Sequence, residues 1–356
     1  MTLAFVSSAR RWGGTEKWTR FAAESLALSH EVHLIARTGI FGHPQGVHTH
    51  RLPFWGEADP TTWAGLFGLI RRHRVDLVIP TRRKDYALTR IAARFGGAKT
   101  VIRLGIVRPV KDDRFQRWLW GGADGILVNS IRTRDALLQS PFILPSRVRL
   151  IYNGVDAERI RRLSVEPDPC PFPRFFAAMG ELSGRKRMDL VIEGFFRFTI
   201  RHPESAMGLV LVGDGPERAN LRRLAADRGI ADRVALTGFL PNPYPILAHA
   251  DGFVLASSNE GIPNAVLEAM SLGRPVIASP ASGAECIQDG KDGFLLDPFD
   301  PDRLAQHLSM LVSNPDLRRR IGEAGRRTVL ARFDPGRMRS ELDAFFMETL
   351  RSGPAS

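Results

Sequence analysis

Cysteines and long apolar runs are scarce in this sequence. Its 356 residues include two cysteines, Cys170 and Cys286. Two cysteines cannot supply the framework of bridges that holds a small secreted domain together, so we expect two reduced thiols in a cytoplasmic protein. No stretch approaches the ~18 consecutive apolar residues of a membrane-spanning helix. The opening MTLAFVSSARRWGG lacks the basic start and the length of a signal peptide, so we expect none.

The sequence also lacks the signatures of several common classes of protein. Ser7–Glu16 follows the first apolar run without a G-x-G-x-x-G motif, which argues against a nicotinamide dehydrogenase. No basic module interleaved with aromatic residues is present, so we expect no nucleic-acid partner, and a basic nucleic-acid-binding protein is only a remote alternative. We find no group of residues with metal-ligand spacing and therefore expect no metal and no cofactor.

Positive charge is concentrated in the first half of the chain. Residues 1–160 hold 25 basic and 13 acidic side chains, a net of +12, whereas residues 161–356 hold 25 of each, a net of 0. A one-sided basic field attracts acidic lipid headgroups or phosphorylated glycans. It therefore predicts peripheral contact with the inner face of an anionic membrane. Helices at Thr61–Ile70 and Lys111–Trp120 combine apolar with basic residues and could lie on that interface. A merely solvated basic surface, with both segments packed on a core, is the alternative.

Strand and helix patterns alternate along both halves of the chain. Apolar runs such as Leu3–Ser7 and Asp76–Pro80 alternate with helical patterns such as Thr15–Ser29. The alternation restarts after Glu166–Pro173, whose four prolines in eight residues suit neither a helix interior nor a central strand. Strands that alternate with helices form parallel sheets. The pattern predicts an α/β protein with two Rossmann-like parallel-sheet domains that face each other across a cleft.

The boundaries of these domains follow from the same pattern. We place the N-terminal domain at residues 1–157, a linker at 158–173 and the second domain at 174–334. A helical pattern at 336–350 closes the chain.

The segment Ser257–Arg274 carries the most informative local pattern. An apolar strand runs into a polar turn and then into a helix that we expect to begin at Pro263, because proline fits the first helical position. The amide groups of Asn264, Ala265 and Val266 would then point out of the helix start. Such groups, together with the helix dipole, can hold a diphosphate.

Two glutamates lie in this segment. Glu260 is in the turn and Glu268 is in the helix, and ionised carboxylates accept hydrogen bonds from sugar and ribose hydroxyls. Two solvated glutamates on an amphipathic helix are the alternative.

A basic loop, Gly184–Asp189, follows the first strand of the second domain. Arg185 and Lys186 in this loop suit the binding of a diphosphate. A solvated basic helix start is the alternative.

The stretch E-G-I-P-N-A-V-L-E-A-M-S-L-G-R-P-V-I-A, residues 260–278, resembles the E-x7-E signature of glycosyltransferase family 4. Members of this family have the GT-B fold and transfer sugars with retention of the anomeric configuration. Further motifs similar to those of the family follow in order along nearly the whole chain: the glycine loop Gly13–Glu16, Val128–Ser130, Ile151–Asp156 and the V-G-D-G-P turn Val212–Pro216.

The resemblance implies roles for individual residues. Glu268 would bind the ribose, Glu260 would contact the donor sugar, and Lys186 would neutralise the diphosphate. The remaining donor-binding positions that the resemblance implies are Gly13, Gly14, Gly213, Gly261, Ile262, Pro263, Asn264 and Ala265.

Two departures from the family pattern affect this assignment. The family motif G-R-L-x-x-x-K has Glu181 in place of its arginine here, and Arg185 would take over the phosphate contact. No histidine follows the strand Thr100–Leu104, where many members have one. Arg103 in this strand would stabilise the leaving diphosphate or meet an anionic acceptor, or it is an exposed strand-end arginine.

The resemblance as a whole implies a retaining glycosyltransferase. The donor would be a nucleoside-diphosphate sugar, with UDP expected ahead of GDP. The acceptor would be a hydroxyl of a lipopolysaccharide-type, lipid-linked or other envelope glycan. The N-terminal domain, with the last helix packed back onto it, would serve the acceptor and the second domain the donor. A sugar-nucleotide epimerase or a phosphorylase of the same fold is the alternative.

Overall fold

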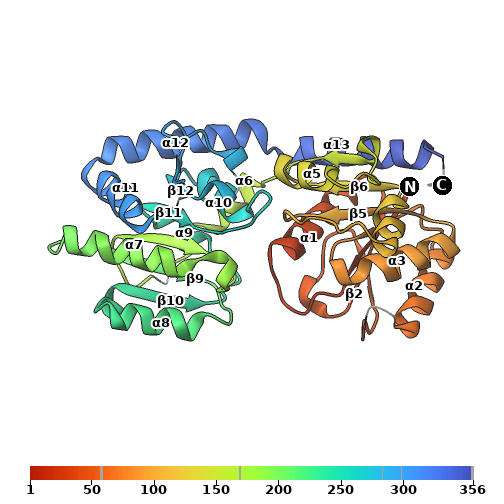
Figure 1. Cartoon of the computed structure of the whole chain (residues 1–356), viewed down its shortest axis with the longest axis horizontal. Helices are drawn as coiled ribbons and strands as arrows, with labels where there is room; N and C mark the ends of the chain where they lie inside the picture. Colours follow the sequence, from red (N-terminus) through yellow and green to blue (C-terminus); the bar gives the residue numbers. More distant parts are fainter. Residues whose placement is uncertain (57–58, 168–169, 283, 298, 354–356) are drawn as a thin grey trace. The chain divides into compact units, whose positions relative to one another are not determined.

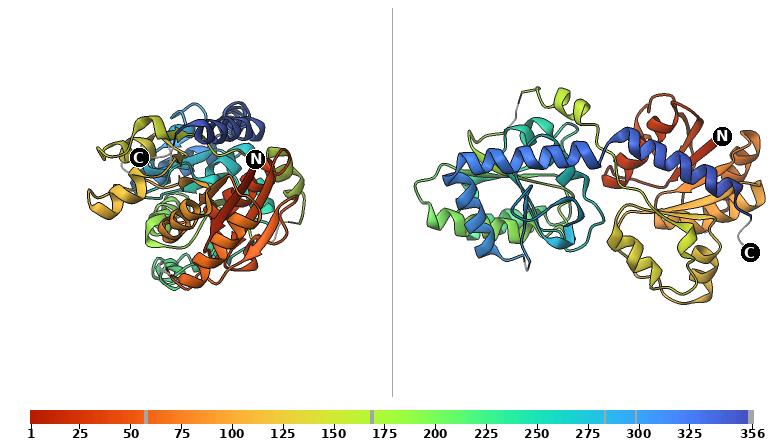
Figure 2. Two further views of the ribbon diagram at one scale, coloured as in Figure 1. Left: turned by 90° about the vertical axis from the view of Figure 1, so that its right-hand side faces the viewer. Right: turned by 90° about the horizontal axis from the view of Figure 1, so that it is seen from above.

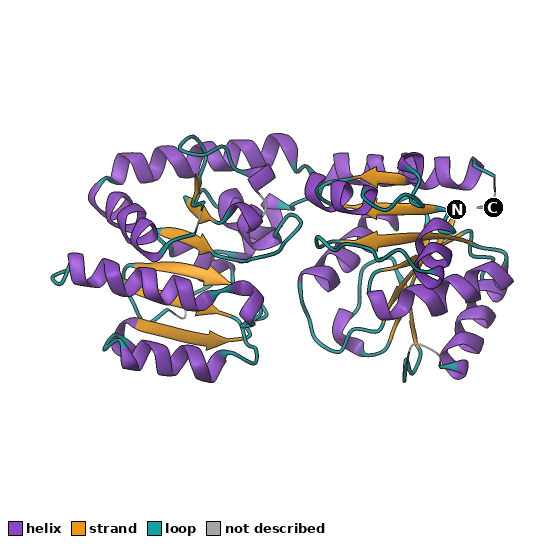
Figure 3. Ribbon diagram, in the orientation of Figure 1, coloured by secondary structure: helices purple, strands orange, loops and turns teal. Residues whose placement is uncertain are grey.

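The chain divides into two compact α/β units. Residues 1–153 and the segment from Pro335 onward form unit 1, and residues 154–334 form unit 2. The structure is a computed structural model that describes residues 1–56, 59–167, 170–282, 284–297 and 299–353. In each unit the strands lie between helices (Figure 3).

Unit 1 is built on a seven-stranded parallel sheet in the order β3-β2-β1-β4-β5-β6-β7. Its strands are β1 (Thr2–Ser7), β2 (Glu31–Ala36), β3 (His48–Arg51), β4 (Leu77–Pro80), β5 (Lys99–Leu104), β6 (Gly125–Val128) and β7 (Val148–Leu150). Its helices are α1 (Gly14–Leu26), α2 (Pro60–Arg72), α3 (Arg83–Gly96), α4 (Arg114–Gln116), α5 (Ile131–Leu138) and α13 (Pro335–Arg351). Short turns η1 (Gly39–Phe41), η2 (Arg117–Gly121) and η3 (Pro145–Arg147) complete it.

Helices cover both faces of this sheet. Because successive side chains of a strand point to opposite faces, each strand contributes to two apolar clusters. In β1, Leu3 and Phe5 face a cluster formed with α1 and α13. Ala4 and Val6 face a second cluster formed with α2 and α3, which lie side by side (Figure 1). The last helix, α13, runs along unit 1 in Figure 2 and contributes four buried side chains to the first cluster: Met338, Leu342, Phe345 and Phe346.

Unit 2 has a six-stranded parallel sheet in the order β10-β9-β8-β11-β12-β13. Its strands are β8 (Phe175–Met179), β9 (Gly208–Val212), β10 (Val234–Gly238), β11 (Gly252–Leu255), β12 (Val276–Ala278) and β13 (Phe294–Leu295). Its helices are α6 (Ala157–Leu163), α7 (Met188–Arg201), α8 (Arg218–Asp227), α9 (Tyr244–His249), α10 (Asn264–Ser271), α11 (Pro301–Ser313) and α12 (Pro315–Arg332). Short turns are η4 (Gly184–Lys186), η5 (Ala231–Arg233), η6 (Pro280–Ser282) and η7 (Ala284–Cys286).

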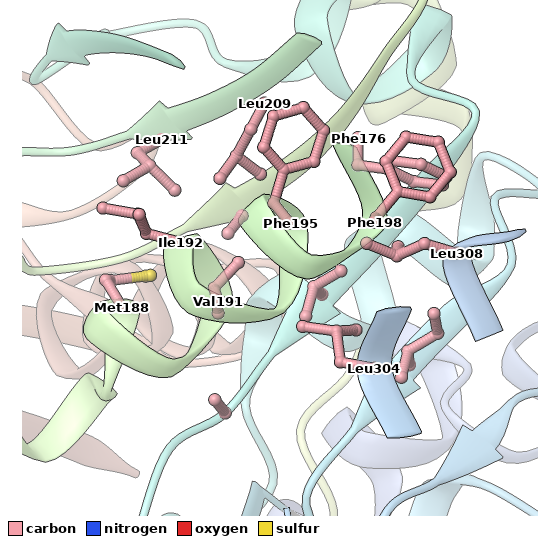
Figure 4. Packing of buried hydrophobic residues seen from close by; sticks show 14 of the residues in the cluster. Phe176, Met188, Val191, Ile192, Phe195, Phe198, Leu209, Leu211, Leu304 and Leu308 are labelled. Atoms are coloured by element: carbon pink, nitrogen blue, oxygen red, sulfur yellow. The ribbon is translucent and has the colours of Figure 1, made fainter. Parts of the chain in front are cut away.

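Helix α7 anchors the core of unit 2. Apolar side chains recur along it at helical spacing, and they meet β8 and β9 on one side and α11 on the other (Figure 4). Phe195 and Phe198 stack with ring centroids 5.8 Å apart. This packing holds the amino end of α7, and with it the basic loop before the helix, at the end of β8. The predicted α/β architecture of two parallel-sheet units is confirmed.

The predicted linker starts too late and contains a helix. Unit 2 begins at Gly154, and residues 157–163 form α6. The Asp156 side chain caps this helix by accepting the amide hydrogen of Arg159 at 2.9 Å, and Ile160 is buried. The described residues between 166 and 173 contain no helix or strand, in keeping with their prolines, and residues 168 and 169 of the predicted linker lie outside the described part.

Candidate functional site

The basic loop and the E-x7-E turn meet in unit 2. The Lys186 Nζ atom lies 2.6 Å from Oε1 of Glu260, and Nη1 of Arg185 lies 2.5 Å from the same oxygen. Arg185 Nη1 also donates to the carbonyl of Asn259 at 2.8 Å. The Ser258 amide donates to the carbonyl of Arg185 at 2.9 Å. The turn after β11 is therefore joined to the loop after β8, and two cations share one carboxylate.

The charges of this cluster interact strongly because Lys186 and Glu260 are buried. Lys186 and Glu260 each keep 8% of their surface exposed, so the predicted alternative of a solvated basic helix start is wrong for Lys186. Burial alone would raise the pKa of the Glu260 carboxyl, but the charges and hydrogen bonds of Lys186 and Arg185 outweigh it. The pKa of Glu260 is therefore lowered, and the three side chains together carry one net positive charge at neutral pH.

Two glycines allow the backbone to pass close to this loop. Gly180, at the end of β8, has a φ of +153°, and Gly213, at the end of β9, has a φ of +140°. A Cβ at Gly213 would lie 2.0 Å from the carbonyl oxygen of Gly180. The Gly213 amide donates to the carbonyl of Gly238 at 2.9 Å, so its N–H is already used within the fold. Close packing against Gly180 therefore requires glycine at 213, and the ligand contact of Gly213 stays a prediction.

The helix after the turn begins one residue later than predicted. Pro263 is the extended residue before α10, with φ −76° and ψ 121°. The Val266 amide donates to the carbonyl of Pro263 at 3.1 Å, so it does not point out of the helix start as predicted. Asn264 and Ala265 remain half-buried at this end, whereas Gly261 and Ile262 are buried.

Glu268 lies inside α10 with 3% of its surface exposed. Both glutamates of the E-x7-E pair are thus buried, and the alternative of two solvated glutamates is wrong. A buried ionisable side chain is unusual, and such positions are frequent at ligand-binding sites.

In unit 1, Arg103 is the last residue but one of β5 and is buried rather than exposed, with 4% of its surface accessible. Its guanidinium lies over the Trp18 ring, 4.3 Å from the centroid. The Tyr86 hydroxyl donates to the Arg103 carbonyl at 2.6 Å. Burial lowers the pKa of Arg103 to about 10, against the opposing effects of Tyr86 and Glu16, so the side chain stays charged at neutral pH. The alternative of an exposed strand-end arginine is wrong.

Acidic side chains gather at the same carboxyl edge of the unit 1 sheet. Glu16 follows Gly13, which precedes α1, and its Oε1 atom lies 2.8 Å from Nε of Arg82. Asp85, in the first turn of α3, accepts the Ser8 amide at 2.8 Å. Among the described residues, Oδ1 of Asp85 has no hydrogen-bond partner. Burial raises the pKa of Asp85 to about 6, despite the Ser8 hydrogen bonds and the charge of Arg82.

The matches to family models cover both units. Residues 12–159 match the model described as Glycosyltransferase Family 4, and residues 173–314 match the model described as Glycosyl transferases group 1. The chain belongs to glycosyltransferase family 4.

Curated relatives of this family 4 chain include two lipopolysaccharide core biosynthesis glycosyltransferases of Rhizobium meliloti. LpsE is 32% identical over 178 residues, which are 50% of this chain and 49% of LpsE. LpsD is 39% identical over 126 residues, which are 35% of this chain and 37% of LpsD. The chain therefore spans half or less of the length of these relatives.

Solved structures resemble the family 4 chain over its whole length. A glycosyltransferase from Rickettsia africae has a TM-score of 0.83, 20% identity and 99% coverage of both chains. Anabaena HepE in complex with UDP-glucose has a TM-score of 0.82 and 20% identity, and covers 98% of this chain and 100% of its own. These likenesses show the fold, and the predicted GT-B class is confirmed.

Sequence reasoning missed several polar residues of unit 1. Glu16 belongs to the glycine loop Gly13–Glu16 after the first strand, and Asp85 follows the strand that ends at Pro80. Ligands of parallel-sheet proteins bind at the carboxyl ends of the strands, so both positions were a usable signal. It also found no metal-ligand cluster, whereas the structure brings together His33, His50 and His73. Alternating histidines on a strand, as in H-T-H at 48–50, were the overlooked signal for this group.

Proposed function

We propose that this chain is a retaining glycosyltransferase that moves a sugar from a nucleoside-diphosphate sugar to a hydroxyl of an envelope glycan. Family membership supports the reaction class, and the names of LpsE and LpsD support a lipopolysaccharide-type acceptor. Structures of HepE with UDP and with UDP-glucose support UDP as the nucleotide, ahead of GDP.

The contact of Lys186 and Arg185 with Glu260 is the observation that carries the proposal. Two cations on one buried carboxylate leave a net positive charge, which a diphosphate would balance. The helix start at Asn264 and Ala265 would add backbone donors.

In the proposed reaction, the bond between the anomeric carbon and the diphosphate oxygen breaks, and the acceptor oxygen bonds to the same face of the sugar. The acceptor proton passes to the leaving diphosphate. Lys186 and Arg185 stabilise the charge that grows on that diphosphate, while Glu260 holds the sugar hydroxyls and Glu268 the ribose hydroxyls. We propose no metal and no cofactor for this transfer.

Unit 1 would serve the acceptor. Because Arg103 is buried beneath Trp18, we propose that it orients Glu16 rather than contacting the diphosphate directly. Glu16 and Asp85 would then offer carboxylate oxygens to an acceptor hydroxyl. The donor contact of Gly13 and Gly14 stays a prediction.

We also propose that unit 1 contacts an anionic membrane from the cytoplasmic side, to reach a lipid-linked acceptor. None of the described helices is long and apolar enough to cross a membrane. In α2, Leu66 and Ile70 are buried in the core and the half-buried Trp63 packs against it. The Trp63 ring also stacks on Phe67 and meets the exposed Phe95 of α3. Aromatic rings beside basic side chains suit a membrane interface.

A transfer assay tests the reaction class. Purified chain is incubated with UDP-[14C]sugars and a bacterial envelope lipid extract, and the product linkage is read by NMR. We expect acceptor-dependent transfer with the anomeric configuration of the donor. Conversion of the donor sugar without acceptor would indicate an epimerase, and release of a sugar phosphate that requires inorganic phosphate would indicate a phosphorylase.

A further inference from the structure

Four histidines gather on one side of the unit 1 sheet, at its β3 edge. His33 of β2 lies beside His48 of the edge strand β3, in parallel register. His50 lies two residues further along β3, and His73 directly follows α2, which covers this face of the sheet. The ring of His33 lies 4.4 Å from that of His73 and 5.2 Å from that of His50, centroid to centroid.

The side-chain nitrogens of three of these residues converge. One ring nitrogen each of His33, His50 and His73 lies within 4.8 Å of the other two. Nδ1 of His33 is 3.0 Å from Nε2 of His50. Two nitrogens bound to one tetrahedral zinc ion, with bonds of about 2.0 Å, lie roughly 3.3 Å apart, so this pair already has nearly the required spacing.

A carboxylate orients the central ring. Nε2 of His33 lies 3.1 Å from Oε1 of Glu31, and the Thr2 hydroxyl donates to Oε2 of the same glutamate at 3.4 Å. When Nε2 carries the ring proton and donates a hydrogen bond to Glu31, the lone pair of Nδ1 is directed at His50. Metal-binding histidines commonly use their second nitrogen in this way, since the carboxylate fixes the tautomer and strengthens the ligand.

We propose that His33, His50 and His73 form a binding site for one divalent transition-metal ion of the zinc class. Three imidazoles suit zinc, copper and nickel and are poor ligands for magnesium and calcium. Three protein ligands leave a fourth position for water, and His48 flanks the group. The proposal is independent of the transferase reaction, because none of these residues belongs to the site around Glu260 or to the acidic group at Glu16.

A bound ion would join three separate elements. His33 comes from β2, His50 from the edge strand β3 and His73 from the end of α2. Strand β3 has only four residues and pairs on one side with β2. Because edge strands and helix ends open more easily than central elements, a metal bridge here would stabilise the part of unit 1 that is least held by its own hydrogen bonds.

Calorimetric titration of the tag-free, EDTA-treated full-length chain with ZnCl2 tests the proposal. We expect one zinc ion per chain with micromolar or tighter affinity, and a higher midpoint of thermal unfolding with zinc. The variants His50→Gln and His73→Gln should each weaken zinc binding at least tenfold and remove the thermal shift. In EDTA their unfolding midpoints should equal that of the wild type, because both rings are only partly buried.

His43→Gln is the matched control, since His43 is an exposed histidine of the same unit outside the group. It should bind zinc like the wild type. Cobalt offers a second readout: Co²⁺ in a site with three imidazole ligands gives visible absorption bands, which the two ligand variants should lose. Equal zinc binding by the wild type and the His50→Gln/His73→Gln double variant would overturn the proposal, as would loss of binding in His43→Gln.

Discussion

Nζ of Lys186 and Oε1 of Glu260 meet at 2.6 Å in the interior of unit 2, although the two residues belong to loops after different strands. Arg185 binds the same oxygen. The contact holds a carboxylate ionised inside the protein and places two cations beside it, which is the arrangement that the proposed transfer requires.

Removal of a positive charge and removal of the negative charge from this cluster should have different effects on UDP binding. Lys186→Met removes a cation, so we expect UDP to bind at least tenfold more weakly. Glu260→Gln leaves both cations without their counter-charge, so we expect UDP to bind as tightly as in the wild type or roughly a few-fold more tightly. Transfer should fall by about 10²-fold or more in both variants.

Calorimetry with UDP and steady-state kinetics measure these effects. Lys291→Met is the control, because Lys291 is an exposed lysine of the same unit and should bind UDP like the wild type. Weaker UDP binding in Glu260→Gln than in Lys186→Met would contradict the proposed division of roles.

Gly213→Ala should destabilise unit 2 strongly. The new Cβ would lie 2.0 Å from the carbonyl oxygen of Gly180, at a φ that L-residues rarely adopt. We expect a loss of about 3 kcal/mol or more in the free energy of unfolding. Gly229→Ala shares a positive φ but has open space around it, so it should cost only about 1 kcal/mol. Urea unfolding followed by hydrogen exchange within unit 2 distinguishes the two, and equal losses would contradict the close-packing explanation.

The buried carboxyl of Asp85 should make unit 1 less stable as the pH rises. Its pKa is about 6 in the fold against 3.8 in the unfolded chain, so the folded state binds the proton more tightly. Stability from this group is therefore fully present below pH 3.8 and is lost as the pH rises through 6.

Asp85→Asn should accordingly stabilise unit 1 at pH 7.5. The full shift corresponds to about 3 kcal/mol, but the amide keeps one buried polar atom unpaired, so we expect about 1–2 kcal/mol. At pH 3.5 the benefit should vanish. Thermal unfolding of the variant and the wild type at the two pH values measures it, and a benefit that is equal at both would rule out titration of Asp85 as the cause.

Arg103→Gln should slow transfer to the acceptor without weakening donor binding. Without the guanidinium, Glu16 loses a neighbouring charge and Trp18 loses the group that packs on its face. We expect kcat with acceptor to fall roughly tenfold, because oriented groups act in the transition state, while the Kd for UDP stays unchanged. A weakened UDP affinity with normal kcat would show that Arg103 contacts the diphosphate after all.

Local patterns in the sequence predicted the elements that depend on nearby residues. Apolar runs located the strands of both units, because a strand that is buried on both faces is apolar along its whole length. Helical spacing located the helices, because a helix that is buried on one side repeats its apolar residues every three or four positions. The E-x7-E stretch and Lys186 were found in the same way, since a strand, a turn and a helix start follow each other directly in the chain.

Features that depend on distant residues could not be predicted. The burial of Arg103 comes from Trp18 and Tyr86, and the histidine group needs β3 to pair with β2 and α2 to end above them. Helix α6 was missed because the prolines after residue 166 drew the predicted linker too far toward the C-terminus, although Asp156 was a usable cap signal.

Calorimetric titration of the chain with UDP, GDP, ADP and CDP, with Glu268→Ala as the paired variant, tests the central claim most directly. The account predicts that UDP binds at roughly micromolar to sub-millimolar Kd, about −5 to −8 kcal/mol. It also predicts that Glu268→Ala weakens this binding at least tenfold while its unfolding midpoint stays near that of the wild type. Absence of binding by any of the four nucleotides, or UDP binding that is unchanged in Glu268→Ala, would contradict the proposed donor site.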